Sequence, residues 1–401
     1  MLNGTRAAVL VAWGMVCLGP AYGEPAQQQP AAPSFELRMV HANRMRMAGK
    51  LADAEKLYSE LLAESESFHK TDVRRPKALN NLAALYHTAG RLDEAERLYV
   101  EALTLFESLT GEDSTDTSAC LNNLGEVRRL RGDLAGAETF FQRALEARES
   151  RLNRSASELA VTLNSRGAVQ LARGDLAGAE QSHARARDLQ EKNELANAVP
   201  LSASLNNLAE VYRLTGRIEQ AEAMFRRALE IRETNLGPEH PETAVVLNNL
   251  GVLMRDRKDW LEAEKLLSRA AAIWYKAAPN GHPMMIPALI NYGEVLSESG
   301  LSLRGETVLL RALEMCAQFV APTHDYVARV KNDLGALHLR QGKGGTAEQW
   351  FQEALAAAQS GGPGKREAVL TAERGIVSAV QLQGRKEDAN ALLEKFGLAL
   401  K

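Results

Sequence analysis

Glycine recurs at an almost fixed interval along the chain, and this period limits the possible folds more than any other feature. Turn-type glycines stand at Gly49, Gly90, Gly132, Gly174, Gly216, Gly300, Gly342 and Gly384. The intervals are 42 residues, except for a first interval of 41 and one of 84 that has Lys258 at its midpoint. A period in this range is typical of repeat arrays, in which each unit packs on its neighbours. The 401 residues therefore predict nine similar units rather than two or three independent domains.

Small residues stand at fixed distances from each turn. Ala or Gly lies five residues after every turn position. Ala or Gly also lies seven residues before eight of the nine turn positions. Large residues such as Phe141 and Phe225 lie nine residues after the turn. Small side chains at these places allow two antiparallel helices to approach closely, and a Gly between the helices adopts the left-handed conformation without a Cβ penalty. We therefore expect backbone strain at Lys258, the one turn position without Gly.

The fifth unit shows the complete pattern. The residues that form this pattern are Leu205, Leu208, Ala209, Tyr212, Gly216, Ala221, Phe225 and Ala228. This pattern resembles the tetratricopeptide repeat, and the 42-residue length resembles its kinesin-light-chain type. The resemblance covers residues 35–400 and implies an all-α fold, a right-handed superhelical solenoid of about nine antiparallel helix–turn–helix units. The aromatic content of only 5% agrees with helices that pack through small residues.

The first residues are expected to lie outside the repeats. Arg6 precedes an apolar run from Ala7 to Leu18, and Ala21 and Gly23 provide the small residues of a cleavage site. The predicted organisation is a signal peptide at 1–23, a Pro/Gln-rich leader at 24–34, and units near 35–75, 76–117, 118–159, 160–201, 202–243, 244–285, 286–327, 328–365 and 366–400. The protein is then exported through the secretory pathway to the periplasm, the cell surface or the medium, without membrane insertion after cleavage.

Asparagine is concentrated at two adjacent places in the first helix of each unit. In units two to eight, eleven of these fourteen positions are Asn. Asn is a mediocre helix former, so something must hold it there. An Asn amide both donates and accepts, and a series of amides can hold an extended peptide backbone. The resemblance implies that this stripe lines a concave groove. The predicted groove residues are Asn81, Asn122, Asn123, Asn206, Asn207, Asn248, Asn249, Asn291, Arg129, Arg213, Arg255, Glu126 and Glu210. The alternative is that the amides bond to neighbouring repeats.

Other candidate sites are weaker. His240, His282 and His324 are one period apart, but residues in register on successive layers do not converge on one zinc ion, so they are interpreted as loop residues. His183 replaces an aromatic and is expected to be an interior histidine with satisfied ring nitrogens. Cys120 and Cys316 are expected to be buried and apolar in role rather than paired.

Composition and motifs together favour an interaction protein. The net charge of −3 gives no reason to expect nucleic acid as a partner, and no catalytic, phosphate-binding or metal motif is found. We therefore expect no enzyme activity, cofactor or metal. The predicted function is an exported scaffold that binds an extended peptide or protein segment in its groove. The alternative is a self-associating structural module whose groove is filled by its own leader or by another copy.

Overall fold

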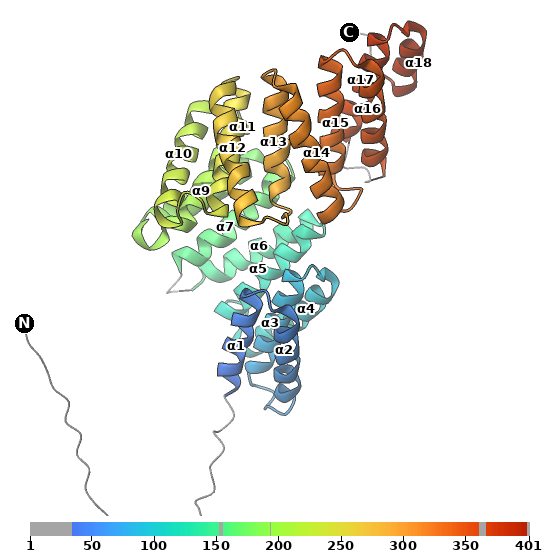
Figure 1. Ribbon diagram of the computed structural model, residues 1–401. Coiled ribbons are helices and arrows are strands. Elements are labelled where there is room, and N and C mark those ends of the chain that lie inside the picture. Colours follow the sequence, from blue (N-terminus) through green and yellow to red (C-terminus); the bar gives the residue numbers. More distant parts are fainter. Residues whose placement is uncertain (1–33, 152–154, 193, 361–365, 399–401) are drawn as a thin grey trace, which may run out of the picture.

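The computed structural model describes residues 34–151, 155–192, 194–360 and 366–398, and these residues form helices and no strand (Figure 1). In chain order the helices are α1 (Phe35–Met47), α2 (Leu51–Ser65), α3 (Arg74–Thr88), α4 (Leu92–Thr110), α5 (Thr115–Leu130), α6 (Leu134–Glu149), α7 (Ala156–Ala172), α8 (Leu176–Glu191), α9 (Glu194–Leu214), α10 (Ile218–Asn235), α11 (Pro241–Asp256), α12 (Trp260–Ala277), α13 (Met285–Glu298), α14 (Ser302–Phe319), α15 (Asp325–Arg340), α16 (Gly344–Gln359), α17 (Arg366–Leu382) and α18 (Lys386–Phe396). These helices make nine consecutive pairs, which confirms the predicted all-α solenoid.

The approximate starts predicted for units two to eight fall inside first helices. The offset from the first residue of the helix ranges from one residue at 286 in α13 to eight residues at 202 in α9. The turn glycines and small residues fix the period but not the first residue of each helix, which depends on the N-cap. The predicted signal peptide, most of the leader and the glycine-rich segment 361–365 lie outside the described residues, whereas Ser34 caps α1 by accepting a hydrogen bond from the Leu37 amide.

All nine turn positions have a left-handed backbone, as the sequence predicts. The eight turn glycines have φ between 74° and 87°, and Lys258 has φ 62° as the only non-glycine residue with positive φ among the described residues. At Gly216 the Arg217 amide donates to the Tyr212 carbonyl, and at Lys258 the Asp259 amide makes the same bond to Met254. This bond satisfies a carbonyl at the end of the first helix. Lys258 therefore adopts the same left-handed turn conformation as the glycines, at the cost of backbone strain.

Within each unit, a small residue on the first helix faces a large one on the second. A Cβ added to Gly125 would lie 2.7 Å from the Phe141 ring, and one added to Gly335 would lie 2.8 Å from Phe351. The small residues after the turns, such as Ala221, are fully buried. Because these contacts leave no room for a larger side chain, they determine how closely the paired helices approach.

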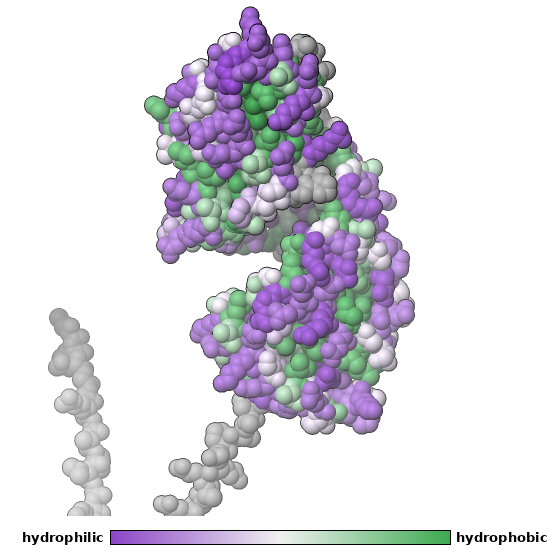
Figure 2. Space-filling view, turned by 90° about the vertical axis from the view of Figure 1, so that its right-hand side faces the viewer, coloured by the Kyte–Doolittle hydropathy of each residue, from purple (hydrophilic) through white to green (hydrophobic). Residues whose placement is uncertain are grey.

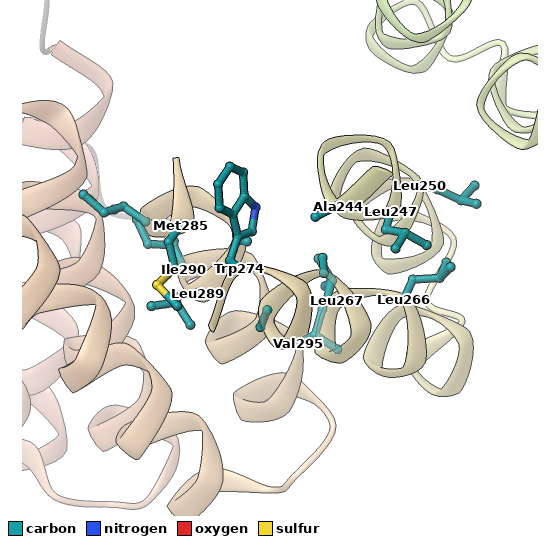
Figure 3. Close-up of a cluster of buried hydrophobic side chains, with 14 of the residues drawn as sticks. Ala244, Leu247, Leu250, Leu266, Leu267, Trp274, Met285, Leu289, Ile290 and Val295 are labelled. Carbon is teal, nitrogen blue, oxygen red and sulfur yellow. The ribbon is translucent and has the colours of Figure 1, made fainter. Parts of the chain in front are cut away.

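The hydrophobic core runs from unit to unit rather than forming one centre. Figure 3 shows part of the largest cluster, where Leu247 of α11, Leu267 of α12 and Val295 of α13 lie along one continuous layer. This cluster extends from Leu201 to Leu337, and a second one extends from Phe35 to Ala144. Each unit thus buries its apolar face against the next, which is how a solenoid obtains its stability.

The fourth unit, α7 and α8, lies between these two clusters, and its interior combines small apolar clusters around Leu163 and Val169 with buried polar side chains. Ser182 donates to Gln170 at 2.7 Å, and Ser204 of the next unit donates to Gln190 at 2.6 Å. His183 is fully buried, and burial lowers its pKa to about 4. Its Nδ1 lies 3.0 Å from Asn164 Oδ1, but its Nε2 has no hydrogen-bond partner. The expectation of a satisfied histidine is therefore only half right, because the second ring nitrogen faces Gly167, which offers no side chain.

The array is curved, with the first helices of the units on its inner side. Each first helix contacts the first helix of the next unit, whereas successive second helices do not approach one another as closely anywhere in the described part of the chain. The space-filling view shows a deep notch between the N-terminal units and the C-terminal part (Figure 2). The Asn-rich first helices therefore line the concave surface, as the resemblance implies.

The three periodic histidines begin or precede helices. His240 caps α11 by accepting from the Glu242 amide, and His324 caps α15 in the same way from Tyr326. His282 accepts from the Met284 amide and stacks on Trp274 at 5.3 Å. These contacts confirm that they are loop residues, each engaged within its own unit.

Two further expectations concern single residues and membranes. Cys120 and Cys316 are buried and form no disulfide with each other, as expected from the sequence.

Among the helices that the structure describes, none combines the length and the apolar character needed to cross a bilayer.

Replacement of Lys258 by Gly is expected to stabilise the protein. A left-handed L-residue costs about 1–2 kcal/mol, of which the greater unfolded-state freedom of Gly offsets roughly half, so a gain of about 1 kcal/mol is expected. Thermal and urea denaturation followed by circular dichroism would measure it. The matched control Gly216→Lys places the same strain in unit five and should lower stability by a similar amount. Equal stability of Lys258→Gly and the wild type would contradict the interpretation.

Candidate peptide-binding groove

Adjacent units are joined by hydrogen bonds between asparagine amides on the concave surface. Asn249 Nδ2 donates to Asn206 Oδ1 at 3.0 Å, and Asn291 Nδ2 donates to Asn248 Oδ1 at 2.8 Å. A longer bond of 3.4 Å joins Asn123 Nδ2 to the Oδ1 of Asn80. We call each such bond an amide rung. It always joins the second Asn of one unit to the first Asn of the unit before, 43 residues earlier.

The rungs from α9 to α13 form one directed chain. Within the pairs, Asn248 Nδ2 donates to Asn249 Oδ1 and Asn206 Nδ2 donates to Asn207 Oδ1. The chain begins at Arg329 of α15, whose Nη2 donates to Asn291 Oδ1 at 2.7 Å. A guanidinium can only donate, so Arg329 fixes the direction of every amide that follows. Asn207 stands at the far end with an Nδ2 that has no partner within the described residues.

In units two to eight the rung is missing at four places, three of which carry a residue that departs from the Asn pattern. Ser165 replaces the second Asn of unit four, and Asn122 instead accepts from Thr162 at 3.1 Å. The expected partner of Asn207 is Asn164, which is engaged by His183 and Ser204.

The other two failures lie toward the ends of the array. The expected partner of Asn81 is Arg38, which forms an ion pair with Glu64 instead. The expected partner of Asp333 is Ile290, which has no polar side-chain atom.

The predicted groove asparagines therefore divide into two groups. Asn206, Asn248, Asn249 and Asn291 use both side-chain atoms within the protein. Asn122, Asn123 and Asn207 each keep one atom without a partner, and Asn81 makes no side-chain hydrogen bond to any described residue. The amides of the first group thus bond to neighbouring repeats, as the alternative interpretation states. The second group has amide atoms available for a ligand. The sequence shows no difference between the two groups, because the pairing depends on residues one unit away.

The predicted groove arginines and glutamates pair with one another. Arg129 bonds Glu126 at 2.9 Å and Arg213 bonds Glu210 at 2.8 Å. The Glu210 carboxylate raises the pKa of the Arg213 guanidinium, although its own burial opposes this. These arginines are thus engaged rather than open to an anionic ligand.

The pairs continue across the units as a network. Arg213 also reaches Asp256 of the next unit at 2.5 Å, and Arg255 reaches Glu294 at 2.7 Å. Glu294 in turn pairs with Arg329 at 3.2 Å. Charges of alternating sign therefore follow the groove from α9 to α15, beside the amide chain.

In the part of the chain that the structure describes, no group of three or more His, Cys, Asp or Glu side chains is arranged to hold a metal ion.

An all-helical array with a concave polar surface defines the class of helical-repeat solenoids. A sequence profile of the tetratricopeptide repeat matches residues 74–150, 158–234, 200–276 and 284–360, and the chain belongs to this family. The family is a non-catalytic repeat scaffold for protein–protein interaction, which is consistent with the prediction that the chain is not an enzyme. A comparison with curated protein sequences gave no match.

Two of the solved structures that the chain matches are similar to it in fold. A Rap protein complexed with Competence and Sporulation Factor has a TM-score of 0.57 at 15% identity, with 88% of this chain and 99% of that chain covered. The apo form of RapI has a TM-score of 0.56 at 12% identity, with coverage of 88% and 98%. BtubC (BKLC) from P. vanneervenii has a TM-score of 0.44 at 24% identity, with coverage of 60% and 92%.

The amide rungs predict different stabilities for two similar substitutions. Asn249→Ala removes a rung and leaves Asn206 Oδ1 and Asn248 Nδ2 unpaired, so it should cost about 1–2 kcal/mol. Asn207→Ala removes only an acceptor for Asn206 and should cost about 0.5 kcal/mol or less. Urea denaturation of both variants would measure the difference, and equal losses would show that the rungs contribute nothing to stability.

Proposed function

We propose that the protein is an exported interaction scaffold that binds an extended peptide or protein segment along the concave surface of its repeats. The observation that carries this proposal is a set of groove amides with atoms that have no partner among the described residues, Asn81, Asn122, Asn123 and Asn207. Each offers a donor or an acceptor on the inner face, where successive first helices lie closest together. A backbone amide of a bound segment has the matching acceptor and donor.

The spacing of the open amides supports an extended ligand rather than a compact one. Asn81 lies in unit two, Asn122 and Asn123 in unit three, and Asn207 in unit five. Each hydrogen bond contributes only about 0.5–1.5 kcal/mol net, so useful affinity requires several units at once. We expect micromolar affinity, about −8 kcal/mol. The Rap protein of similar fold was solved in complex with Competence and Sporulation Factor.

Export is the second part of the proposal, and it rests on the N-terminal sequence alone. If the protein carries a cleaved signal, N-terminal sequencing of material recovered outside the cytoplasm should begin near Glu24. A mature protein that still begins at Met1 would contradict export by cleavage. Light scattering on the same material would test the self-association alternative, which requires a species larger than the 43.8 kDa chain.

The groove is tested by selecting decapeptides that bind the wild-type protein from a random library and measuring their affinities for variants. The double variant Asn81→Ala/Asn207→Ala should weaken binding about tenfold, since two hydrogen bonds of roughly 0.7 kcal/mol each are lost. Its stability should remain close to that of the wild type because neither residue forms a rung.

Asn235→Ala provides the matched control. Asn235 is exposed at the end of the second helix α10 and bonds only the Ile231 carbonyl of its own helix. This variant should bind the selected peptides with unchanged affinity. Peptides that bind the double variant as well as the wild type would place the binding surface elsewhere.

A further inference from the structure

The C-terminal end of the groove contains a cleft with an unusual excess of acidic side chains. It lies between α13, α15 and α17 and has a volume of about 560 Å³. Its lining carries four carboxylates, on Glu294, Asp325, Asp333 and Glu367, against the single cation Arg329. Arg329 is already paired with Glu294. Beside this pair, the lining residues offer no second Lys or Arg to Asp333 and Glu367.

Two acceptor atoms in this cleft are buried without partners. Asn332 is only 5% exposed, and although its Nδ2 donates to the Ala368 carbonyl at 3.3 Å, its Oδ1 accepts from nothing. Asp333 is partly exposed as a residue, but its Oδ2 is buried and has no hydrogen-bond partner. A buried unpaired acceptor is costly, and a buried unpaired carboxylate more so.

The repeat pattern explains why Asp333 has no partner. It occupies the place of the second Asn, from which an amide rung would reach the unit before, and that unit has Ile290 at the receiving place. Ile290 is fully buried in the apolar core. The protein thus has a carboxylate in place of an amide at a unit whose predecessor offers no polar side chain for a rung.

We propose that this cleft binds the cationic side chain of a lysine or arginine in the bound segment, with Asp333 as its counter-charge and Asn332 Oδ1 as a second acceptor. This inference rests on the proposed binding of an extended segment in the groove. Ammonium and guanidinium groups only donate, and the two unpartnered atoms only accept. A desolvated pair with good geometry is strong enough to select a basic residue over a neutral one.

The ionisation of Asp333 supports this assignment and provides a second test. Burial raises its pKa to about 8, with Glu294 of α13 adding to the effect and Arg329, Arg255 of α11 and Arg340 opposing it. Asp325 on α15 and Glu367 on α17 are the other charged groups of the cleft. The unliganded carboxyl is thus mostly protonated at pH 7, and a bound cation favours its ionised form. Affinity for a cation must therefore increase as the pH rises toward 8.

The test uses the full chain and Nα-acetyl-lysine methylamide as the probe, with Nα-acetyl-norleucine methylamide as the neutral compound of similar shape. In an NMR titration at pH 8.5, the lysine compound should shift amide signals of α15 and α17 and bind at least tenfold more tightly than the norleucine compound. Its affinity should fall roughly five- to tenfold at pH 7.0, where less of Asp333 is ionised. Equal affinities, or no binding of either compound at 50 mM (about −1.8 kcal/mol), would overturn the proposal.

Two variants complete the experiment. Asp333→Asn keeps the shape and removes the charge, so it should lower lysine affinity at least tenfold and abolish the dependence on pH. Asp53→Asn removes one negative charge from the exposed face of α2 and should change neither the affinity for the lysine compound nor its dependence on pH. Full affinity in Asp333→Asn would overturn the assignment. Because the probe is a single residue, its failure leaves the decapeptide result of the Asn81→Ala/Asn207→Ala variant unaffected, so the two proposals fail separately.

Discussion

The structure depends on the close contact between a small residue of the first helix and a large residue of the second within the repeated units. Where Gly125 faces Phe141, a single added methyl group would lie 2.7 Å from the ring. This contact sets the distance between the paired helices, and the left-handed turn sets their connection. Because a small residue stands at this place in eight of the nine units, these units hold their first helices in nearly the same orientation. The regular stripe on the concave surface is a consequence of this internal packing.

The fold could be predicted from the sequence because this packing depends on local residues at fixed spacing. Gly216 and Ala221 belong to the same helix pair as Phe225, so their roles can be inferred within one unit. The partners of the groove asparagines could not be predicted in this way. Whether Asn249 bonds Asn206 depends on the offset between helices of adjacent units, which no single unit contains. Helix starts were misplaced for a related reason, since caps such as His240 lie in the variable connections.

The groove combines two kinds of polar interaction with different tasks. The amides of the rungs bond to one another, and the arginines pair with carboxylates between α9 and α15. Both kinds of contact join the first helices of neighbouring units. Among the described residues, three polar side chains of the groove have unused atoms because the residue one unit away is changed or already engaged. They are Asn81 opposite Arg38, Asn207 opposite the engaged Asn164, and Asp333 opposite Ile290. A groove residue whose partner one unit away is changed or engaged is therefore a candidate ligand contact.

The partly polar interior of the fourth unit has a thermodynamic consequence for the array as a whole. In a solenoid, the coupling between neighbouring units determines how far unfolding spreads along the chain. The apolar layers on either side end near this unit, from Phe35 to Ala144 and from Leu201 to Leu337. The amide rungs are also interrupted here, at Ser165. Small apolar clusters around Leu163 and Val169 and buried hydrogen bonds take the place of a large apolar layer in this unit. We therefore expect unfolding to spread across the fourth unit less readily than within either large cluster.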